Sequence, residues 1–145
     1  MSVTHISAAL RREVVERADS RCEYCGVPED TRIARHEPDH IIGEQHGGVT
    51  SLDNLAFACF RCNRFKGPNS ATRDPHDRVL VPLYHPRRDH WADHFHFDGA
   101  LILPRTPIGR GTAALLRLND EQRALFRSVL LEQGRYWPPQ TPGHS

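Results

Sequence analysis

Two Cys-x-x-Cys pairs constrain this chain more than any other feature of its sequence. The first pair is Cys22 and Cys25, the second is Cys59 and Cys62, and together they account for all four cysteines. Each short turn brings two sulfur atoms to one side, and four thiolates can surround a zinc ion tetrahedrally. The alternatives are unrelated buried thiols or a redox pair, but two matched pairs favour a metal site. We therefore predict a structural zinc site with four cysteine ligands.

The spacer between the two pairs is 33 residues long, which is enough for a folded unit to lie between them. Zinc would then connect the segment before Cys22 to the second pair. In such a site the metal-binding free energy acts as folding free energy, on the order of 10 kcal/mol.

Local patterns predict a helix over residues 7–19 with Ser7 as its cap, because apolar residues recur there at helical spacing. They also predict a strand over 36–42, a loop over 43–53, a return strand over 55–58 and a helix over 59–66. The spacer and the second cysteine pair therefore alternate strand, loop, strand and helix.

The C-terminal part is predicted to contain a brief strand at 79–83 and a hairpin over 94–103 that turns at Asp98-Gly99. Two helices follow: one runs from Thr106-Pro107 to about residue 118, and the other from a cap at Asn119 to about residue 133. For the last helix we expect a buried face made of Leu125, Val129 and Leu130. The fold class is therefore α+β.

Charge gives limited information about partners. The net charge is +1, whereas nucleic-acid-binding domains are usually strongly basic. However, 18 of the 19 basic residues are Arg, which grips phosphate with a planar fork, although a GC-rich genome would produce the same bias. No apolar run is long enough to span a membrane and the N-terminus does not look like a signal peptide, so the expected location is cytoplasmic.

Several polar motifs occur in a fixed order around the second cysteine pair. In chain order they are Asp39-His40-Ile41-Ile42, Gly47-Gly48, Asn54-Leu55, and Cys59-Phe60-Arg61-Cys62-Asn63 with Lys66. From Cys22 to Lys66 the chain resembles the HNH endonuclease family. The resemblance implies a ββα-metal core stapled by the four-cysteine zinc site. Around this core we expect the N-terminal helix, the C-terminal hairpin and the two C-terminal helices.

The resemblance also implies a role for each polar residue. His40 would be the general base, Asn54 would orient the loop around it, and Asp39 with Asn63 would hold a catalytic Mg²⁺ or Mn²⁺. Nucleic-acid contacts are expected from the helix that carries Asn63, namely from Arg61, Arg64 and Lys66, although a solvated helix face is equally compatible with these three residues. Adjacent residues of a regular strand point to opposite faces. A shared site for Asp39 and His40 therefore needs a twist or bulge near Pro38.

We expect a single domain over residues 1–145, with a core at 20–67, a C-terminal extension at 68–137 and a disordered tail at 138–145. The expected activity is metal-dependent hydrolysis of DNA phosphodiester bonds, without a small-molecule cofactor or a membrane partner. The alternative is a zinc-stapled nucleic-acid-binding module with little or no cleavage, and a zinc scaffold for protein partners is a third reading. A homodimer stays open, because two copies would supply the two sites that a double-strand break needs.

Overall fold

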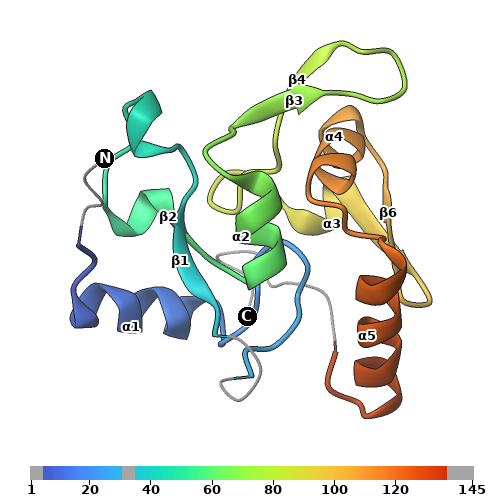
Figure 1. The fold of residues 1–145 in the computed structure, drawn as a ribbon, viewed down its shortest axis with the longest axis horizontal. Coiled ribbons are helices and arrows are strands. Elements are labelled where there is room, and N and C mark those ends of the chain that lie inside the picture. The colour runs from blue at the N-terminus through green and yellow to red at the C-terminus, as the bar shows by residue number, and fades with distance from the viewer. Residues whose placement is uncertain (1–4, 31–34, 137–145) are drawn as a thin grey trace.

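The structure is a computed structural model that describes residues 5–30 and 35–136, and the predicted disordered tail lies outside these ranges. It is an α+β fold of helices and two-stranded hairpins, as predicted (Figure 1). In chain order the helices and strands are α1 (Ala8–Arg17), β1 (Glu37–His40), β2 (Leu55–Ala58), α2 (Phe60–Lys66), β3 (Ala71–Arg73), β4 (Leu80–Pro82), α3 (Trp91–His94), β5 (Phe95–Asp98), β6 (Leu101–Pro104), α4 (Pro107–Leu115) and α5 (Glu121–Glu132). Two short 3₁₀ helices, η1 (Glu44–His46) and η2 (Leu52–Asn54), lie in the loop between β1 and β2.

The β1–β2 hairpin is the centre of the N-terminal half, and it lies between α1 and α2 (Figure 1). Successive side chains of β2 point to opposite faces of the hairpin, so each face packs against a different apolar cluster. Leu55 and Phe57 pack with Val14 of α1, whereas Ala56 and Ala58 belong to the main core. The small alanine side chains leave room for the cysteine turns that pack on that face.

Helix α1 begins where the sequence predicts. The side chain of Ser7 accepts a hydrogen bond from the backbone N–H of Leu10 at 3.1 Å, which satisfies one of the free donors of the first turn. One side of the helix is anchored by Val14, which is fully buried. Burial of a side chain of this size contributes about 1.5–3 kcal/mol.

The main core joins the cysteine turns to the C-terminal extension. Its most deeply buried members from the extension include Trp91, Phe95, Ile102, Leu116 and Leu118, all at most 2% exposed. The extension therefore packs onto the first half instead of forming a core of its own.

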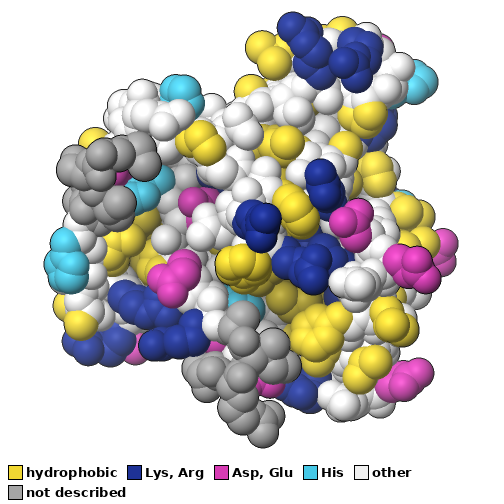
Figure 2. Space-filling model, viewed as in Figure 1, with side chains coloured by type: hydrophobic (Ala, Val, Ile, Leu, Met, Phe, Trp, Pro, Cys, Tyr) yellow, Lys and Arg dark blue, Asp and Glu magenta, His cyan; other side chains and the backbone are white. Residues whose placement is uncertain are grey.

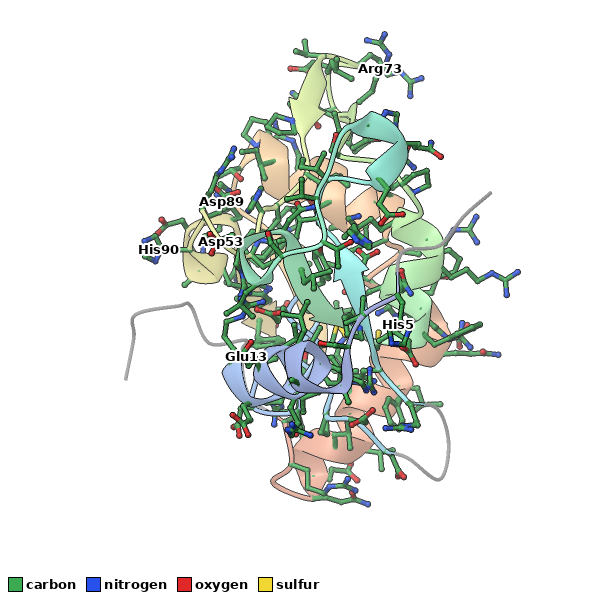
Figure 3. All side chains as sticks on the ribbon, turned by 90° about the vertical axis from the view of Figure 1, so that its left-hand side faces the viewer. His5, Glu13, Asp53, Arg73, Asp89 and His90 are labelled. Atoms are coloured by element: carbon green, nitrogen blue, oxygen red, sulfur yellow. The ribbon has the colours of Figure 1, made fainter. Side chains whose placement is uncertain are left out.

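The extension also contains elements that local patterns did not predict. Strand β3 pairs with β4 in a hairpin, and Trp91–His94 forms the one-turn helix α3. The β3–β4 hairpin projects from the body of the molecule, and Arg73 lies at its outer end, far from Glu13 on α1 (Figure 3). None of the helices in the described part of the chain combines the length and the apolar character that crossing a membrane requires.

Helix α5 differs from the prediction in both its cap and its buried face. Its N-cap is Asp120, while the Asn119 amide instead brackets Ile102, accepting from its N–H at 2.8 Å and donating to its carbonyl oxygen at 2.7 Å. Leu125 and Val129, expected to be buried, are 64% and 42% exposed. The residues of α5 that are buried are Arg123, Arg127 and Leu130. The prediction was correct for Leu130 and wrong for Leu125 and Val129, because apolar periodicity does not reveal a core that accepts arginine.

Candidate functional site

The four cysteines converge on one buried point. Their sulfur atoms lie within 4.8 Å of one another, and Cys25 Sγ is 3.7 Å from Cys59 Sγ. Sulfurs around a tetrahedral zinc ion are roughly 3.8 Å apart, given Zn–S bonds of about 2.3 Å. A disulfide needs about 2.05 Å, so these spacings match a metal cage and not a bond between sulfurs. The donor set fits zinc.

Local backbone geometry shapes each half of this cage. In the first turn, Gly26 adopts a positive φ of 83°, and its N–H bonds the carbonyl of Cys22 at 2.9 Å. In the second, Cys59 caps α2, and its sulfur accepts from the N–H of Cys62 at 3.4 Å. The positive end of the α2 dipole therefore faces the sulfur atoms and favours thiolates.

The cysteines differ in acidity. Burial raises the pKa of the Cys22 and Cys62 thiols well above the usual value. Hydrogen bonds from the Cys22, Cys59 and Cys62 side chains lower the pKa of Cys25. A cation in the cage would reverse the effect of burial, because metal binding deprotonates coordinating thiols.

The carboxylate of Asp39 points from β1 toward α2. Its Oδ2 atom forms an ion pair with Lys66 Nζ at 3.0 Å, and the same ammonium group donates to the carbonyl oxygen of His40 at 2.9 Å. Burial raises the pKa of Asp39, and the Lys66 charge opposes this rise. The side chain of Lys66 is only 2% exposed, so its position does not fit the predicted phosphate contact. The sequence suggested a surface cation, but this lysine neutralises a buried carboxylate.

Strand β1 pairs with β2 at all four positions, so it has no bulge at Pro38. The side chains of Asp39 and His40 contact different elements, but the charge of His40 still reaches Asp39 and lowers its pKa, against the rise that burial causes. The ring Nε2 of His40 lies 2.8 Å from Thr50 Oγ1. The two residues that the His40 ring contacts, Thr50 and Glu44, are in the β1–β2 loop, whereas Asp39 contacts Lys66 of α2.

The hydrogen bonds around His40 define its tautomer. The Thr50 hydroxyl donates to Glu44 Oε1 at 3.2 Å, and a hydroxyl has only one proton to give. Thr50 must therefore accept from Nε2–H of His40, which leaves the lone pair on Nδ1. Glu44 Oε1 itself lies 3.5 Å from Nε2. Sequence reasoning did not identify Glu44 or Thr50. No local pattern could have found them, because both contacts depend on how the β1–β2 loop folds back over the end of β1.

Asn54 ties the ends of this loop together. Its Oδ1 accepts from the N–H of Ile42, and its Nδ2 donates to the carbonyl oxygens of Ile42 and Val49, each at 2.9 Å. The loop passes so close here that a Cβ on Gly48 would lie 1.7 Å from the carbonyl oxygen of Ile42. This arrangement fixes the segment just after His40.

Helix α2 carries the remaining predicted residues. Asn63 is partly buried, lies one turn before Lys66, and its amide forms no hydrogen bond with the described part of the chain. Arg61 and Arg64 are exposed on the same helix. The view in Figure 2 shows Lys and Arg side chains over the region of α2, with hydrophobic side chains between α2 and α5.

A further contact reaches the cysteines from α5, and sequence reasoning missed it. Arg123 Nη2 lies 3.0 Å from Cys62 Sγ and 3.7 Å from Cys59 Sγ. No local signal could have found this residue, because it is 61 positions after Cys62.

Two comparisons with known proteins find a match for part of this chain. Residues 22–69 match the family model described as HNH endonuclease. A stretch of 58 residues is 38% identical to the CRISPR-associated endonuclease Cas9 of Corynebacterium diphtheriae, covering 39% of this chain and 5% of that protein. No solved structure matches the chain. Residues 22–69 are thus similar to HNH endonucleases, and the rest of the chain lies outside the family match.

Proposed function

We propose that this chain is a metal-dependent endonuclease that hydrolyses DNA phosphodiester bonds, with His40 as the general base. The observation that carries the proposal is the hydrogen-bond chain from Glu44 through Thr50 to His40 Nε2. This chain leaves Nδ1 of His40 as a proton acceptor. The match of residues 22–69 to HNH endonucleases supports the same reaction class.

Asp39 and Asn63 are the proposed ligands of a catalytic divalent cation. Lys66 binds Oδ2 of Asp39, so Oδ1 is the carboxylate oxygen offered to a cation, together with the amide oxygen of Asn63. These are hard oxygen donors, which suit Mg²⁺ or Mn²⁺. When bound, such an ion neutralises the charge that develops on the phosphate and on the leaving oxygen.

The roles of the other residues follow from their contacts. His40 Nδ1 would take the proton of a water molecule, while Thr50 and Glu44 keep the ring in one orientation. Asn54 would hold the loop so that the ring stays in place. Lys66 would hold the Asp39 carboxylate toward α2. For phosphate contacts we propose Arg61 and Arg64, which are exposed on α2, and no longer Lys66.

The cysteine cage is proposed to hold a structural zinc ion. Four thiolates leave no position for a substrate, so this ion would have no part in the chemical step. It would instead fix the N-terminus of α2, which carries Asn63 a few residues later.

Plasmid nicking tests the catalytic proposal directly. The wild type should nick supercoiled DNA with Mg²⁺ or Mn²⁺ and stop in EDTA. His40→Ala should lose about 10²–10⁴-fold in rate, because the proton acceptor is gone. The matched control is His46→Ala, since His46 is an exposed histidine in the same loop. A His40→Ala enzyme that nicks as fast as the control would disprove the role of His40.

The second candidate is a zinc-stapled nucleic-acid-binding module with little or no cleavage. It is favoured by the ion pair of Asp39 with Lys66, which already satisfies one carboxylate oxygen. Wild-type protein that binds DNA at low salt but does not cut it with any divalent ion would establish this candidate.

A further inference from the structure

The C-terminal extension touches the metal cage through a buried positive charge. The guanidinium group of Arg123 donates to Cys62 Sγ at 3.0 Å and also lies 3.7 Å from Cys59 Sγ. Its other nitrogen donates to the carbonyl oxygen of Leu116 at 2.6 Å, so the fork is held between α4 and the second cysteine turn. The residue is only 6% exposed.

The buried charge of Arg123 is stable only if the sulfur atoms beside it are negatively charged. In the described part of the chain its partners are two carbonyl oxygens and two sulfurs, with no carboxylate among them. A buried guanidinium without an anionic partner is strongly unfavourable. Zinc with four thiolates carries two net negative charges, and Arg123 offsets one of them.

Further contacts connect the extension to the first cysteine turn. The three consecutive residues Glu23, Tyr24 and Cys25 each contact a side chain of the extension. Arg87 forms an ion pair with Glu23. Trp91 Nε1 donates to the carbonyl oxygen of Tyr24 at 2.9 Å. The hydroxyl group of Tyr136 donates to the carbonyl oxygen of Cys25, the third residue in the row. The extension therefore contacts both cysteine turns: the first through Arg87, Trp91 and Tyr136, and the second through Arg123.

We propose that Arg123 is the counter-cation of the zinc–thiolate centre, and that helix α5 is held on the core by the metal. This inference rests on the proposed zinc site. Without the metal the anionic centre would no longer form, and the Arg123 charge would be buried without its partner. The helix would then detach from the cage. The α1 side of the molecule would be less affected, because Val14, Leu55 and Phe57 form a separate apolar cluster.

Zinc release to a coloured chelator tests the charge partnership. Removal of a group that bonds a metal ligand typically weakens metal binding about 10–100-fold. Arg123→Met should therefore lose zinc about tenfold faster than the wild type, and Arg123→Lys, which keeps the charge but not the fork, should lie between them. The matched control is Arg117→Met, because Arg117 is exposed nearby and stacks on Phe65 at 4.7 Å. The zinc release rate of Arg117→Met should stay within about twofold of the wild-type rate.

Hydrogen exchange of the wild-type protein tests the second part of the proposal, that the metal holds α5 on the core, and needs no variant. Chelation should increase exchange in α5, residues 121–132, earlier and more strongly than in α1, residues 8–17. Equal zinc release from Arg123→Met and the control would overturn the counter-cation role. Unchanged protection of α5 after complete zinc removal would overturn the metal-held docking. If the purified wild-type protein contains no zinc, the proposed zinc site itself is disproved. Metal analysis before chelation detects that outcome separately.

Discussion

Asn54 shows how one side chain can fix a whole loop. Its amide satisfies both backbone groups of Ile42 and the carbonyl of Val49, which sit on opposite sides of the first 3₁₀ turn. A carboxamide both donates and accepts, which neither the carboxylate of Asp nor the apolar side chain of Leu can do. The adjacent Gly48 lets the two backbone segments approach, since any Cβ there would collide with Ile42.

Replacing Asn54 by Ala should destabilise the fold by about 2–4 kcal/mol, because three backbone groups lose their partner. Urea unfolding followed by far-UV circular dichroism measures this loss. The control is Asn69→Ala, whose amide makes a single bond to the carbonyl of Lys66 at 3.0 Å on an exposed residue. Equal stability of the two variants would contradict the bracing role of Asn54.

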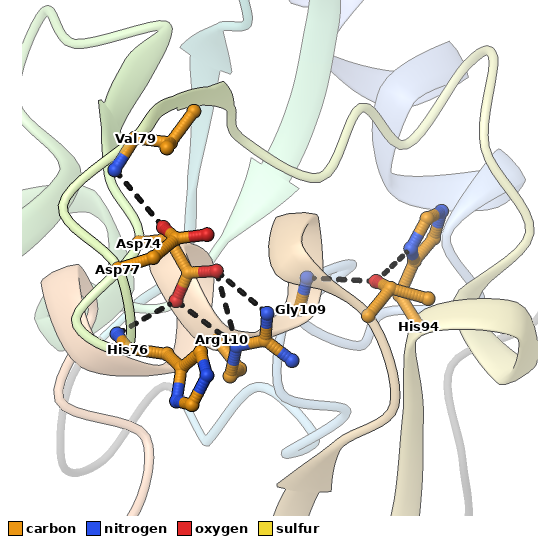
Figure 4. A network of polar contacts seen from close by, with 8 residues as sticks. Asp74, His76, Asp77, Val79, His94, Gly109 and Arg110 are labelled. Carbon is orange, nitrogen blue, oxygen red and sulfur yellow. Dashed lines mark hydrogen bonds and ion pairs between the residues drawn. The ribbon is translucent and has the colours of Figure 1, made fainter.

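At the scale of elements, the β3–β4 hairpin is fastened to α4 by one ion pair. Arg110 Nε donates to Asp74 Oδ1 at 2.9 Å and its Nη2 to Asp74 Oδ2 at 2.7 Å, a two-point contact shown in Figure 4. On the other side, Thr106 caps α4 through the N–H of Gly109 and also bonds His94. Helix α4 comes so close to the hairpin that a Cβ on Gly111 would lie 2.9 Å from Thr72 Cγ2.

The ion pair makes the docking of this hairpin dependent on pH. Hydrogen bonds from Arg110 lower the pKa of Asp74 to about 2 in the folded protein, whereas an unfolded Asp titrates near about 3.9. The folded state therefore binds the proton less well. The stabilisation is fully present above pH of about 4 and is lost as the pH falls toward about 2.

Unfolding midpoints in urea at pH 6, 4 and 2.5 should show this loss for the wild type. In Asp74→Asn the part of the decline that comes from this pair should disappear, and stability at pH 6 should be lower from the start. Asp77→Asn is the control, because Asp77 lies in the same hairpin but accepts from the N–H of Val79 at 3.0 Å, while its charge acts on Arg110 more weakly than Asp74 does. Identical pH profiles for wild type and Asp74→Asn would rule out the pair as the cause.

At the scale of the whole molecule, the cysteine cage is where the two halves meet. The family match ends at residue 69, yet Trp91, Tyr136 and Arg123 all reach back to the cysteine turns. The main core contains all four cysteines together with residues from β5, β6, α4 and α5. A metal ion at this point would therefore stabilise more of the chain than the HNH segment alone.

Metal analysis of the purified protein should find one zinc ion per chain. Cys62→Ser should lose the ion and several kcal/mol of stability, because metal binding is coupled to folding in sites of this kind. Thermal unfolding with and without a strong chelator measures the effect, and adding zinc back should restore the wild type but not the variant. A wild type with the same melting temperature before and after metal removal would exclude a structural role for the ion.

The sequence alone determined the parts of this protein that local rules control. The strand over 55–58, the cap at Ser7, the helix start at Thr106-Pro107 and the meeting of the four cysteines all agree with the structure. Spacing, capping and turn residues act over a few positions, so they can be read in order along the chain. The HNH motif between residues 22 and 69 was legible for the same reason.

Only the tertiary structure decided where the charges lie. Lys66 looked like a surface cation but pairs with Asp39, which comes from another element, β1. The buried face of α5 contains two arginines: Arg123 meets the sulfur of Cys62, 61 positions away in the chain, and Arg127 donates to the carbonyl oxygen of Ala100. Local patterns cannot predict such pairs, since a buried charge is stable only beside a partner that the fold brings to it. The cysteine spacing predicted the four-cysteine cluster, but only the packing of the extension placed Arg123 beside it.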